Sequence, residues 1–376
     1  MKSLRTDNFR ALCQEYGISA KTGYKWQKRF MQEGMAGMAE QSRRPWSHAD
    51  RLSENVICAM VRLKLAHRHW GPKKIRQLYL RQYGTAASES SFKRVLERVG
   101  LTEPRRRRFK AAAGGRLWSE RRGQAPNEVW TVDFKGWWYD PQGQRCEPLT
   151  VRDEYSRYVL ELRRVRDARS GTVRQCFEQL FARHGLPGAI RSDNGSPFAQ
   201  VRGILGLSRL SAWWVALGID LERGRPGHPQ DNGAHERLHR DIGVELEPAK
   251  TAPQEALDLW RQEFNHERPH EALGMKCPAE VYQPSTRSYA GTPVDLVYPG
   301  MDTRRVGQHG KIRWAGAMYF ISYSLADWSV GIKPVAGGRQ EVWFGRLLLG
   351  WLDPATQSFQ RAEDRPLKAS HQETNV

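Results

Sequence analysis

The sequence predicts a multidomain chain with an all-α N-terminal part, an α/β core and a small all-β C-terminal barrel. Three observations favour this: the length of 376 residues, a concentration of basic residues before residue 126, and two changes of hydrophobic periodicity further along. The expected domains are a helix-turn-helix DNA-binding domain (1–44), a second helical DNA-binding domain (45–103), a basic linker (104–125), a core (126–285), a β-barrel domain (286–353) and a disordered tail (354–376).

The positive charge is unevenly distributed. The chain has 60 Lys and Arg against 41 Asp and Glu, a formal charge of +19. Residues 1–125 hold 28 basic and 10 acidic residues, and residues 126–376 hold 32 and 31. Such a charge opposes folding through self-repulsion unless a polyanion binds, so we expect the N-terminal third to bind nucleic acid. The alternative is a basic surface that only aids solubility.

Other features exclude whole classes of protein. No window reaches the ~20 consecutive apolar residues that a membrane span requires, and the start MKSLRTDNFR lacks the apolar run of a secretory signal. The five cysteines are scattered singly, as is usual in a reducing compartment. We therefore expect a soluble, intracellular protein with no membrane partner.

Residues 9–31 read as a helix-turn-helix. Apolar residues at helical spacing run from Phe9 to Tyr16, Gly17 makes a turn, and Ser19 can cap a second helix towards Met31. The second helix of this motif can enter the major groove. The residues expected to contact DNA are Lys21, Lys25, Lys28 and Arg29.

A second helical unit follows. Ser53 can cap a helix to about His67, Pro72 can start another, and Ser88 can cap a third that ends at Gly100. Lys73 and Lys74 are further expected DNA contacts. The run PRRRRFK comes next, and we expect Arg105, Arg106, Arg107 and Arg108 to bind the DNA backbone, although a solvated tether is the alternative.

The core begins as an alternating strand from Glu128 to Lys135, which places Asp133 opposite Trp130 and Val132. Further strands at 146–151 and 158–164, a helix at 172–184 and a short strand that leads to Asp193 should follow. The stretch PGHPQDNGAHERLHR then predicts a helix that carries Glu236, with His239 and Arg240 one turn on and on the same side.

Two aspartates on adjacent strand ends and a glutamate on a crossing helix would form one acidic cluster. Taken singly, Asp133 is more readily an exposed strand residue, Asp193 a turn residue and Glu236 a salt-bridging helix residue. Their combination with the neighbouring residues favours a shared site instead. Clustered carboxylates repel one another unless they are protonated or bind cations. Mg²⁺ or Mn²⁺ suits such oxygen ligands, and two ions about 3.5–4 Å apart can promote phosphodiester chemistry.

Four motifs together resemble a known family. They are TVDFKG at 131–136, RSDNGSPF at 191–198, GHPQDNGAHERLHR at 227–240 and FNHERPHEALG at 264–274. In this order, behind a helix-turn-helix, they are similar to the integrase core of bacterial insertion-sequence transposases, which are DDE enzymes related to retroviral integrases. The resemblance spans about residues 9–350 and implies an RNase H-like core.

The resemblance also implies roles. The catalytic, metal-binding acids would be Asp133, Asp193 and Glu236: the first would bridge two Mg²⁺ or Mn²⁺ ions, and each of the others would hold one. Such enzymes bind terminal inverted repeats, cut at the element ends with water and join the freed 3′-hydroxyl to target DNA, as a homodimer or higher oligomer. The resemblance therefore also implies a cytoplasmic, nucleoid-associated bacterial protein with no small-molecule substrate. This chain departs from the pattern in having 42 residues between Asp193 and Glu236, and no zinc-binding Cys and His set.

Several neighbours of the acids have two interpretations. Asn194 and Asn232 can orient carboxylates or contact DNA, and turn chemistry explains either equally well. His228, Arg237 and Arg240 are candidate phosphate ligands, with an ion pair as the alternative for Arg237. Metal binding by His235 and His239 is disfavoured without a third soft ligand. We expect structural roles for Asp153 in a turn and for the segment Arg268–His270.

The C-terminal part has short alternating runs between Val294 and Leu352, separated by Gly and Asp turns, which predict a small barrel or sandwich. Its aromatic residues are expected mainly in the core; they are Trp314, Tyr319, Phe320, Trp328, Trp343 and Trp351. Two other functions stay open. One is a non-catalytic DNA-binding regulator that retains the fold, and the other is a metal-dependent nuclease without strand transfer.

Overall fold

The computed structural model describes residues 8–40, 52–102, 122–139, 143, 145–200, 202–224, 233–246 and 254–362. The chain divides into two compact units, residues 1–58 and 59–376. Each unit is described by itself. In the described residues, no helix is both long and apolar enough to cross a membrane.

The first unit has the predicted helix-turn-helix. Helix α1 (Phe9–Glu15) is capped by Asn8, and α2 (Ala20–Glu33) is capped by Ser19, whose side chain accepts from the Thr22 N–H. A 3-10 helix, η2 (Gly34–Met38), follows. The two helices pack through Cys13 and Gly23, because the small side chains let them approach closely.

The second helical module consists of α3 (Glu54–Ala66), α4 (Pro72–Tyr83) and α5 (Glu89–Arg98). Pro72 begins α4 and Ser88 caps α5, as the sequence predicts. The module has its own small core, formed by Met60, Trp70, Ile75, Tyr79, Phe92 and Leu96.

From Ala59 on, this module belongs to the same unit as the core and contacts it. His67 Nδ1 lies 2.9 Å from Glu263 Oε1, and Arg81 Nη2 lies 2.6 Å from Glu280 Oε2. The ring of Trp70 packs under the guanidinium of Arg268 at 5.9 Å. Polar and cation–π contacts therefore join the module to the C-terminal part of the core.

The core sheet has five strands in the order β5-β4-β1-β6-β7. Their bounds are β1 (Val129–Phe134), β4 (Pro148–Asp153), β5 (Val159–Arg164), β6 (Ala189–Ser192) and β7 (Asp220–Arg223). The first three are antiparallel, as predicted, while β1, β6 and β7 run parallel. The strand expected at 146–151 is broken at Glu147, because β3 (Arg145–Cys146) pairs with β2 (Trp138–Tyr139) in a separate hairpin.

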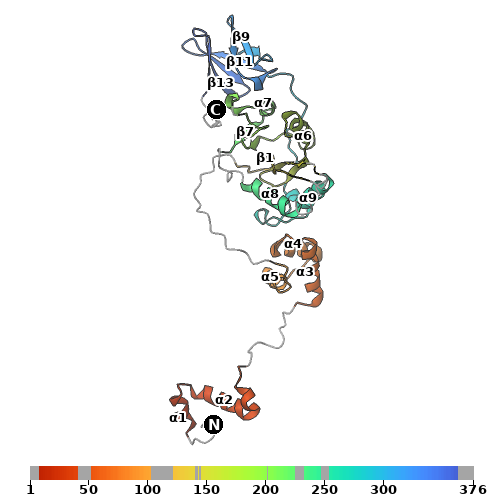
Figure 1. Cartoon of the computed structure of the whole chain (residues 1–376), viewed down its shortest axis with the longest axis vertical. Coiled ribbons are helices and arrows are strands. Elements are labelled where there is room, and N and C mark those ends of the chain that lie inside the picture. Colours follow the sequence, from red (N-terminus) through yellow and green to blue (C-terminus); the bar gives the residue numbers. More distant parts are fainter. Residues whose placement is uncertain are drawn as a thin grey trace, which may run out of the picture. The chain divides into compact units, whose positions relative to one another are not determined.

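Helices cover both faces of this sheet (Figure 1). On one face, α6 (Ser170–His184) and α7 (Arg209–Ala216) bury Phe177, Phe181 and Trp213 against Trp130. On the other, α8 (Gly233–Glu245) and α9 (Gln254–His266) pack Leu238, Ile242 and Trp260 against β5. Short 3-10 helices complete the core; they are η3 (Ile204–Gly206), η6 (Glu271–Leu273) and η7 (Pro278–Glu280).

The C-terminal domain is all-β, as predicted. A five-stranded antiparallel sheet has the order β14-β13-β12-β11-β8, and β9 and β10 form a separate pair. The bounds are β8 (Asp302–Arg305), β9 (Lys311–Trp314), β10 (Ala317–Phe320), β11 (Ser329–Pro334), β12 (Gln340–Phe344), β13 (Leu347–Asp353) and β14 (Ser358–Arg361), with η8 (Tyr323–Leu325) between β10 and β11. Among the described strands, no ladder closes these sheets into the expected barrel, because β9 and β10 pair only with each other.

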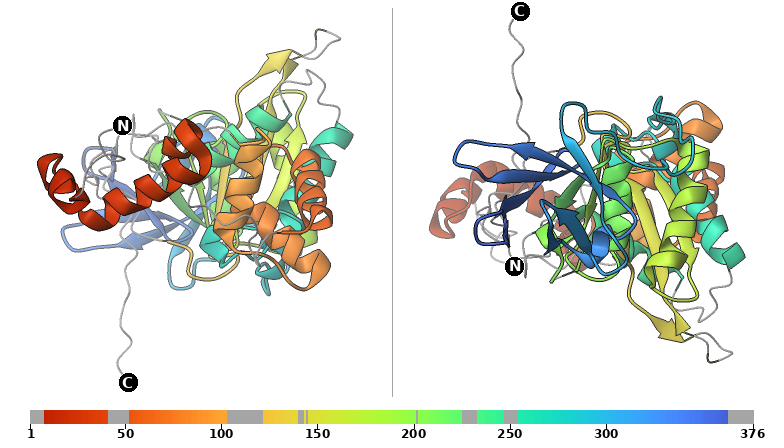
Figure 2. Two further views of the ribbon diagram at one scale, coloured as in Figure 1. Left: turned by 90° about the horizontal axis from the view of Figure 1, so that it is seen from below. Right: turned by 90° about the horizontal axis from the view of Figure 1, so that it is seen from above.

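Two further expectations about this domain are wrong. Phe320 is 37% exposed and contacts Tyr323, so it is not a core residue. Strand β14 lies in the segment expected to be disordered, and its ladder with β13 extends the sheet. Helix α7 links this domain to the core, since Trp213 and Trp214 pack in the core cluster while Ala212 and Ala216 pack in the C-terminal cluster. Figure 2 shows the blue strands of this domain beside the green segments of the core.

Candidate active site

Asp133 and Asp193 lie at the same edge of the core sheet. Strands β1 and β6 are parallel neighbours, with Thr131 opposite Arg191. Asp133 is two residues beyond Thr131, and Asp193 is two residues beyond Arg191, so the register carries both aspartates to adjacent positions. The sequence prediction of a strand-end pair is confirmed by this geometry.

The environment of Asp133 connects it to the other two acids. Burial raises its pKa to about 7, and the charges of Asp193 and then Glu236 add to this shift. The Phe134 N–H, which donates to Asp133 Oδ1 at 2.8 Å, opposes it. The shift shows that three segments of the chain bring their carboxylates within electrostatic reach of one another.

The segment after β6 fixes the backbone of Asp193. Its Oδ1 accepts from the Gly195 N–H at 3.1 Å, and Asn194 Nδ2 donates to the Gly224 carbonyl at 2.8 Å. Asn194 therefore holds a turn against the end of β7. Before the turn, the buried Arg191 contacts Glu154 at 2.6 Å and Glu222 at 3.1 Å, which ties β6 to its neighbours.

Helix α8 presents one face to solvent and one to the sheet. Glu236, Arg237 and Arg240 are exposed, whereas Leu238 and Ile242 are buried. The expectation that His239 shares the side of Glu236 and Arg240 is wrong, because its side chain is only 14% exposed and points to the strands.

Both histidines of α8 are bonded to threonines of the sheet. His235 Nδ1 lies 2.9 Å from Thr131 Oγ1, and His235 Nε2 lies 2.5 Å from Thr150 Oγ1. His239 Nε2 lies 2.8 Å from the same Thr150 oxygen. Burial lowers the pKa of His239 to about 3 and that of His235 well below its usual range, so both rings are neutral. The three nitrogens that contact threonines lend no support to the disfavoured metal-binding interpretation, and the fourth, His239 Nδ1, lies 3.9 Å from Asp133 Oδ2.

The donor chemistry of the three acids suits a hard divalent cation. All three offer carboxylate oxygens, which Mg²⁺ and Mn²⁺ prefer. A bound cation would oppose the raised pKa of Asp133, which burial causes first and the charges of Asp193 and Glu236 increase. In the described part of the chain, however, no three His, Cys, Asp or Glu side chains already converge on one metal position. The site roles of the three acids stay a prediction.

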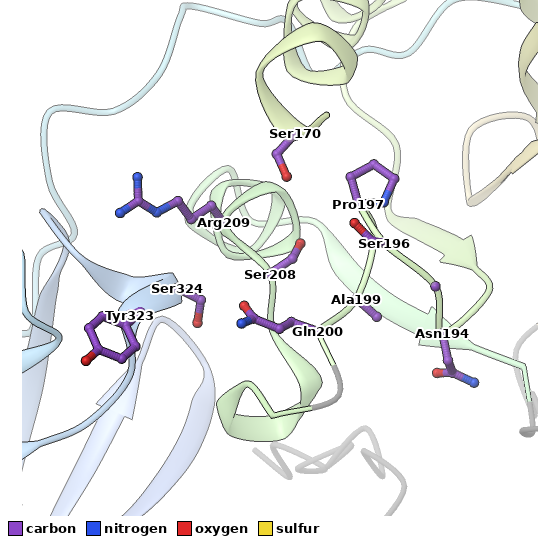
Figure 3. A pocket seen from close by; sticks show the side chains of 11 residues that line it. Ser170, Asn194, Ser196, Pro197, Ala199, Gln200, Ser208, Arg209, Tyr323 and Ser324 are labelled. Carbon is purple, nitrogen blue, oxygen red and sulfur yellow. The ribbon is translucent and has the colours of Figure 1, made fainter. Parts of the chain in front are cut away.

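A pocket of about 590 Å³ opens beside the Asp193 turn (Figure 3). It is lined by Asn194 and Gln200 from the core, Arg209 at the start of α7, and Tyr323 and Ser324 from the C-terminal domain. Sequence reasoning missed Arg209 and Tyr323. Arg209 could have been placed at the start of a helix, because it directly follows Ser208, a residue type that caps helices. Nothing in the local sequence links Tyr323 to pocket residues more than a hundred positions earlier.

The expected DNA contacts have varied environments. Lys21, Lys25 and Lys28 are exposed, and Lys25 and Arg29 lie over the ring of Trp26 at 5.6 and 5.2 Å. In contrast, Lys73 lies 3.5 Å from Glu271 and 3.6 Å from Glu89. Burial, reinforced by Arg268, lowers the pKa of Lys74 to about 8.

Lys73 therefore has acidic neighbours and Lys74 is partly buried within the second unit. The polar local sequence around both lysines did not indicate these environments. Arg105, Arg106, Arg107, Arg108, His228 and Asn232 lie outside the described residues.

Asp153 and the segment after α9 have the expected structural roles. Asp153 is fully buried and accepts from the Ser156 and Asn127 N–H groups at 2.7 Å each. Arg268 lies 2.9 Å from Asp241 and 3.0 Å from Glu245, so it fixes the second half of α8.

Family comparisons match three regions of the chain. Residues 123–229 and 217–278 match models of the integrase core domain, and residues 22–96 match a homeodomain-like domain. The first two matches together cover the sheet, α8 and α9. The third runs from α2 to α5.

Similar proteins occur in bacterial insertion elements. The insertion element IS407 uncharacterized 31.7 kDa protein of Burkholderia multivorans is 28% identical over 236 residues, which cover 60% of this chain and 81% of that protein. The insertion element IS476 uncharacterized 39.2 kDa protein of Xanthomonas euvesicatoria is 26% identical over 235 residues, 61% of this chain and 64% of that protein. This chain thus spans just under two thirds of the second relative.

Among solved structures, the HTLV-2 integrase catalytic core domain in complex with magnesium is 17% identical, with a TM-score of 0.33. The match covers 43% of this chain and all of that one.

Proposed function

Since the chain belongs with the integrase-core proteins of bacterial insertion elements, we propose that it is a DNA transposase. It would bind the terminal inverted repeats of its element, cleave DNA at the element ends and join the 3′-hydroxyl ends to target DNA. The homeodomain-like region supports DNA recognition, and the integrase core supports polynucleotidyl transfer.

One observation carries the catalytic part of this proposal. The parallel register of β1 and β6 puts Asp133 and Asp193 on neighbouring strand ends, and the charges of Asp193 and Glu236 add to the burial that raises the pKa of Asp133 to about 7. Mutual repulsion of three acids at a sheet edge costs stability, and such costs are typical of functional sites. A bound divalent cation would offset this repulsion between the three carboxylates.

Asp133, Asp193 and Glu236 would hold Mg²⁺ or Mn²⁺, with two ions expected. When bound, such ions activate an attacking oxygen and stabilise the leaving oxygen of a phosphodiester. The chain's own part is to fix the ligands: Phe134 N–H orients Asp133, and Gly195 N–H orients Asp193.

DNA would be held around the acids by residues on exposed surfaces. Arg237 and Arg240 stand on the same exposed face of α8 as Glu236 and are suited to bind phosphates. The pocket beside Asn194 offers space next to the second acid, with Arg209 on its wall (Figure 3). His228 and Asn232 stay predicted supporting residues. Because two element ends must be processed, we expect the active form to be at least a dimer on DNA, acting at the bacterial nucleoid.

The test is an incubation of purified protein with DNA that carries the element end, a target plasmid and Mg²⁺. We expect cleaved ends and joined products, both of which disappear when EDTA removes the metal. Nicked ends without joined products would favour a nuclease. Binding to the end without any cleavage would favour a regulator, and either result would contradict the proposal.

A further inference from the structure

The buried network under α8 ties two of the predicted acids together. Thr150 of β4 is fully buried, and its hydroxyl contacts both His235 and His239. The same hydroxyl donates to the main-chain oxygen of Asp133 at 2.8 Å. One oxygen atom therefore joins the strand of Asp133 to the helix turn that carries Glu236.

The hydrogen-bond directions follow from the number of protons. A hydroxyl has a single hydrogen, and the carbonyl of Asp133 can only accept it. Both imidazoles must therefore donate to Thr150 from Nε2, which assigns the tautomer from the network. His235 Nδ1 is then an acceptor. The Thr131 hydroxyl can donate either to this nitrogen at 2.9 Å or to the Arg152 carbonyl at 3.4 Å, and the shorter contact assigns its hydrogen to His235.

Apolar packing alone does not set the position of Glu236. Leu238 and Ile242 hold α8 against β5, but such packing is non-directional and tolerates small shifts along the helix axis. Arg268 fixes the second half of α8 through Asp241 and Glu245. In the first two turns of α8, on either side of Glu236, both buried histidines make directional bonds to the sheet.

We propose that His235, His239 and Thr150 are positioning residues that fix α8 on β1 and thereby the separation of Glu236 from Asp133. This inference rests on the proposed function of the acids. Such directional bonds matter because a shift of about 1 Å in the position of a catalytic group can lower the reaction rate about a hundredfold. The histidines touch neither DNA nor metal in this role.

The first test compares Thr150→Val, which keeps the shape but removes the hydroxyl, with Thr150→Ser, which keeps the hydroxyl. Joining of precut ends is measured to separate kcat from KM. Thr150→Val should lose about 10- to 100-fold in kcat with KM for DNA unchanged, and Thr150→Ser should restore most of it. The control is His184→Phe on α6, a partly buried histidine away from this network, whose Nδ1 lies 3.3 Å from Tyr282 Oη. The kcat of this variant should stay near that of the wild type.

A double-mutant cycle tests whether the residues act through one network. If they do, His235→Leu combined with Thr150→Val should lose little more activity than the worse single variant. Multiplied losses would show independent effects and overturn the proposal. Equal losses in Thr150→Val and Thr150→Ser, or a fall in kcat explained by a lower folded fraction in thermal melts, would also overturn it.

A second readout does not depend on turnover. Mn²⁺ titrated into the complex of protein and end DNA, and followed by electron paramagnetic resonance, should bind about tenfold or more weakly in Thr150→Val than in wild type or His184→Phe. Unchanged Mn²⁺ binding would contradict the positioning role. A third outcome separates the two proposals. If wild type binds Mn²⁺, Thr150→Val binds it more weakly and neither protein joins DNA ends, the proposed function fails while the positioning role stands.

Discussion

At the scale of single residues, buried charges in this core have specific partners. Arg191 and Arg268 are each only 6% exposed at the side chain, and each meets two carboxylates. Removal of one partner from such a group leaves an uncompensated charge and costs about 3–5 kcal/mol. His270 differs, because it is buried among cations and its Nε2 has no hydrogen-bond partner in the described residues.

His270 should make the protein sensitive to acid. Burial, together with Lys74, Arg268, Arg157 and Arg152, lowers its pKa to about 2 from an ordinary value of 6.5. The folded state therefore binds fewer protons than the unfolded state below pH 6.5. The stability that His270 contributes is present above pH 6.5 and is lost as the pH falls towards 2.

The measurement is urea unfolding at pH 7 and pH 4.5 for wild type and His270→Phe. Between these values, the free energy of unfolding of the wild type should fall by about 2–3 kcal/mol more than that of the variant. Equal losses in both proteins would show that His270 is not held neutral.

At the scale of elements, the close contact of α1 and α2 depends on Gly23. A Cβ at this position would collide with Cys13 Sγ and lie 3.2 Å from the ring of Phe9. Gly23→Ala should thus lower the melting temperature of the N-terminal unit and weaken DNA binding, although Ala favours helices by about 1 kcal/mol.

The matched control is Gly171→Ala, in the first turn of α6, where a Cβ meets nothing within 4 Å. This variant should keep or slightly raise stability. If Gly23→Ala behaves like Gly171→Ala in thermal melts, α1 and α2 do not pack as described.

The elements with strong local signals are the ones that the sequence predicts well. The Ser19 cap and the strand that carries Asp133 are set by neighbouring residues, and both occur as expected, although the first four residues of β1 are buried on both faces. The orientation of α8 is only partly local: the spacing of Leu238 and Ile242 marks a buried face, but the polarity of His235 and His239 gives no sign that they share it. That orientation depends on Thr131 and Thr150, which lie 104 and 85 residues away from His235.

The same reason explains the errors in the C-terminal domain. Alternation predicts strands but does not say which face is covered, and Phe320 lies on the outer face. The pocket beside Asp193 could not be predicted either, because it needs the core and the C-terminal domain together. The three candidate acids could be singled out because each belongs to a short motif, and their mutual effect becomes visible only in the structure.

At the scale of the whole molecule, the charge is divided between the N-terminal third and the rest of the chain. The basic excess lies in residues 1–125, while the remainder is nearly neutral and contains the three acids. This division predicts that salt weakens DNA binding mainly through the N-terminal third.

Replacement of Arg105–Arg108 by Ala, in a segment outside the described residues, tests this division. DNA affinity should fall, and the slope of its logarithm against the logarithm of salt concentration should become shallower by about one unit for each phosphate that the variant no longer binds. Fluorescence anisotropy at several salt concentrations gives the slope. An unchanged slope would mean that these arginines only tether the domains.

The central claim is that Asp133, Asp193 and Glu236 form one metal-dependent active site. The most direct measurement is joining of element ends to target DNA by wild type, Asp133→Asn, Asp193→Asn and Glu236→Gln, with end binding measured in parallel. We predict that each substitution abolishes joined products while end DNA is still bound. Joined products that persist in any one of the three variants, at a rate near that of the wild type, would contradict the account.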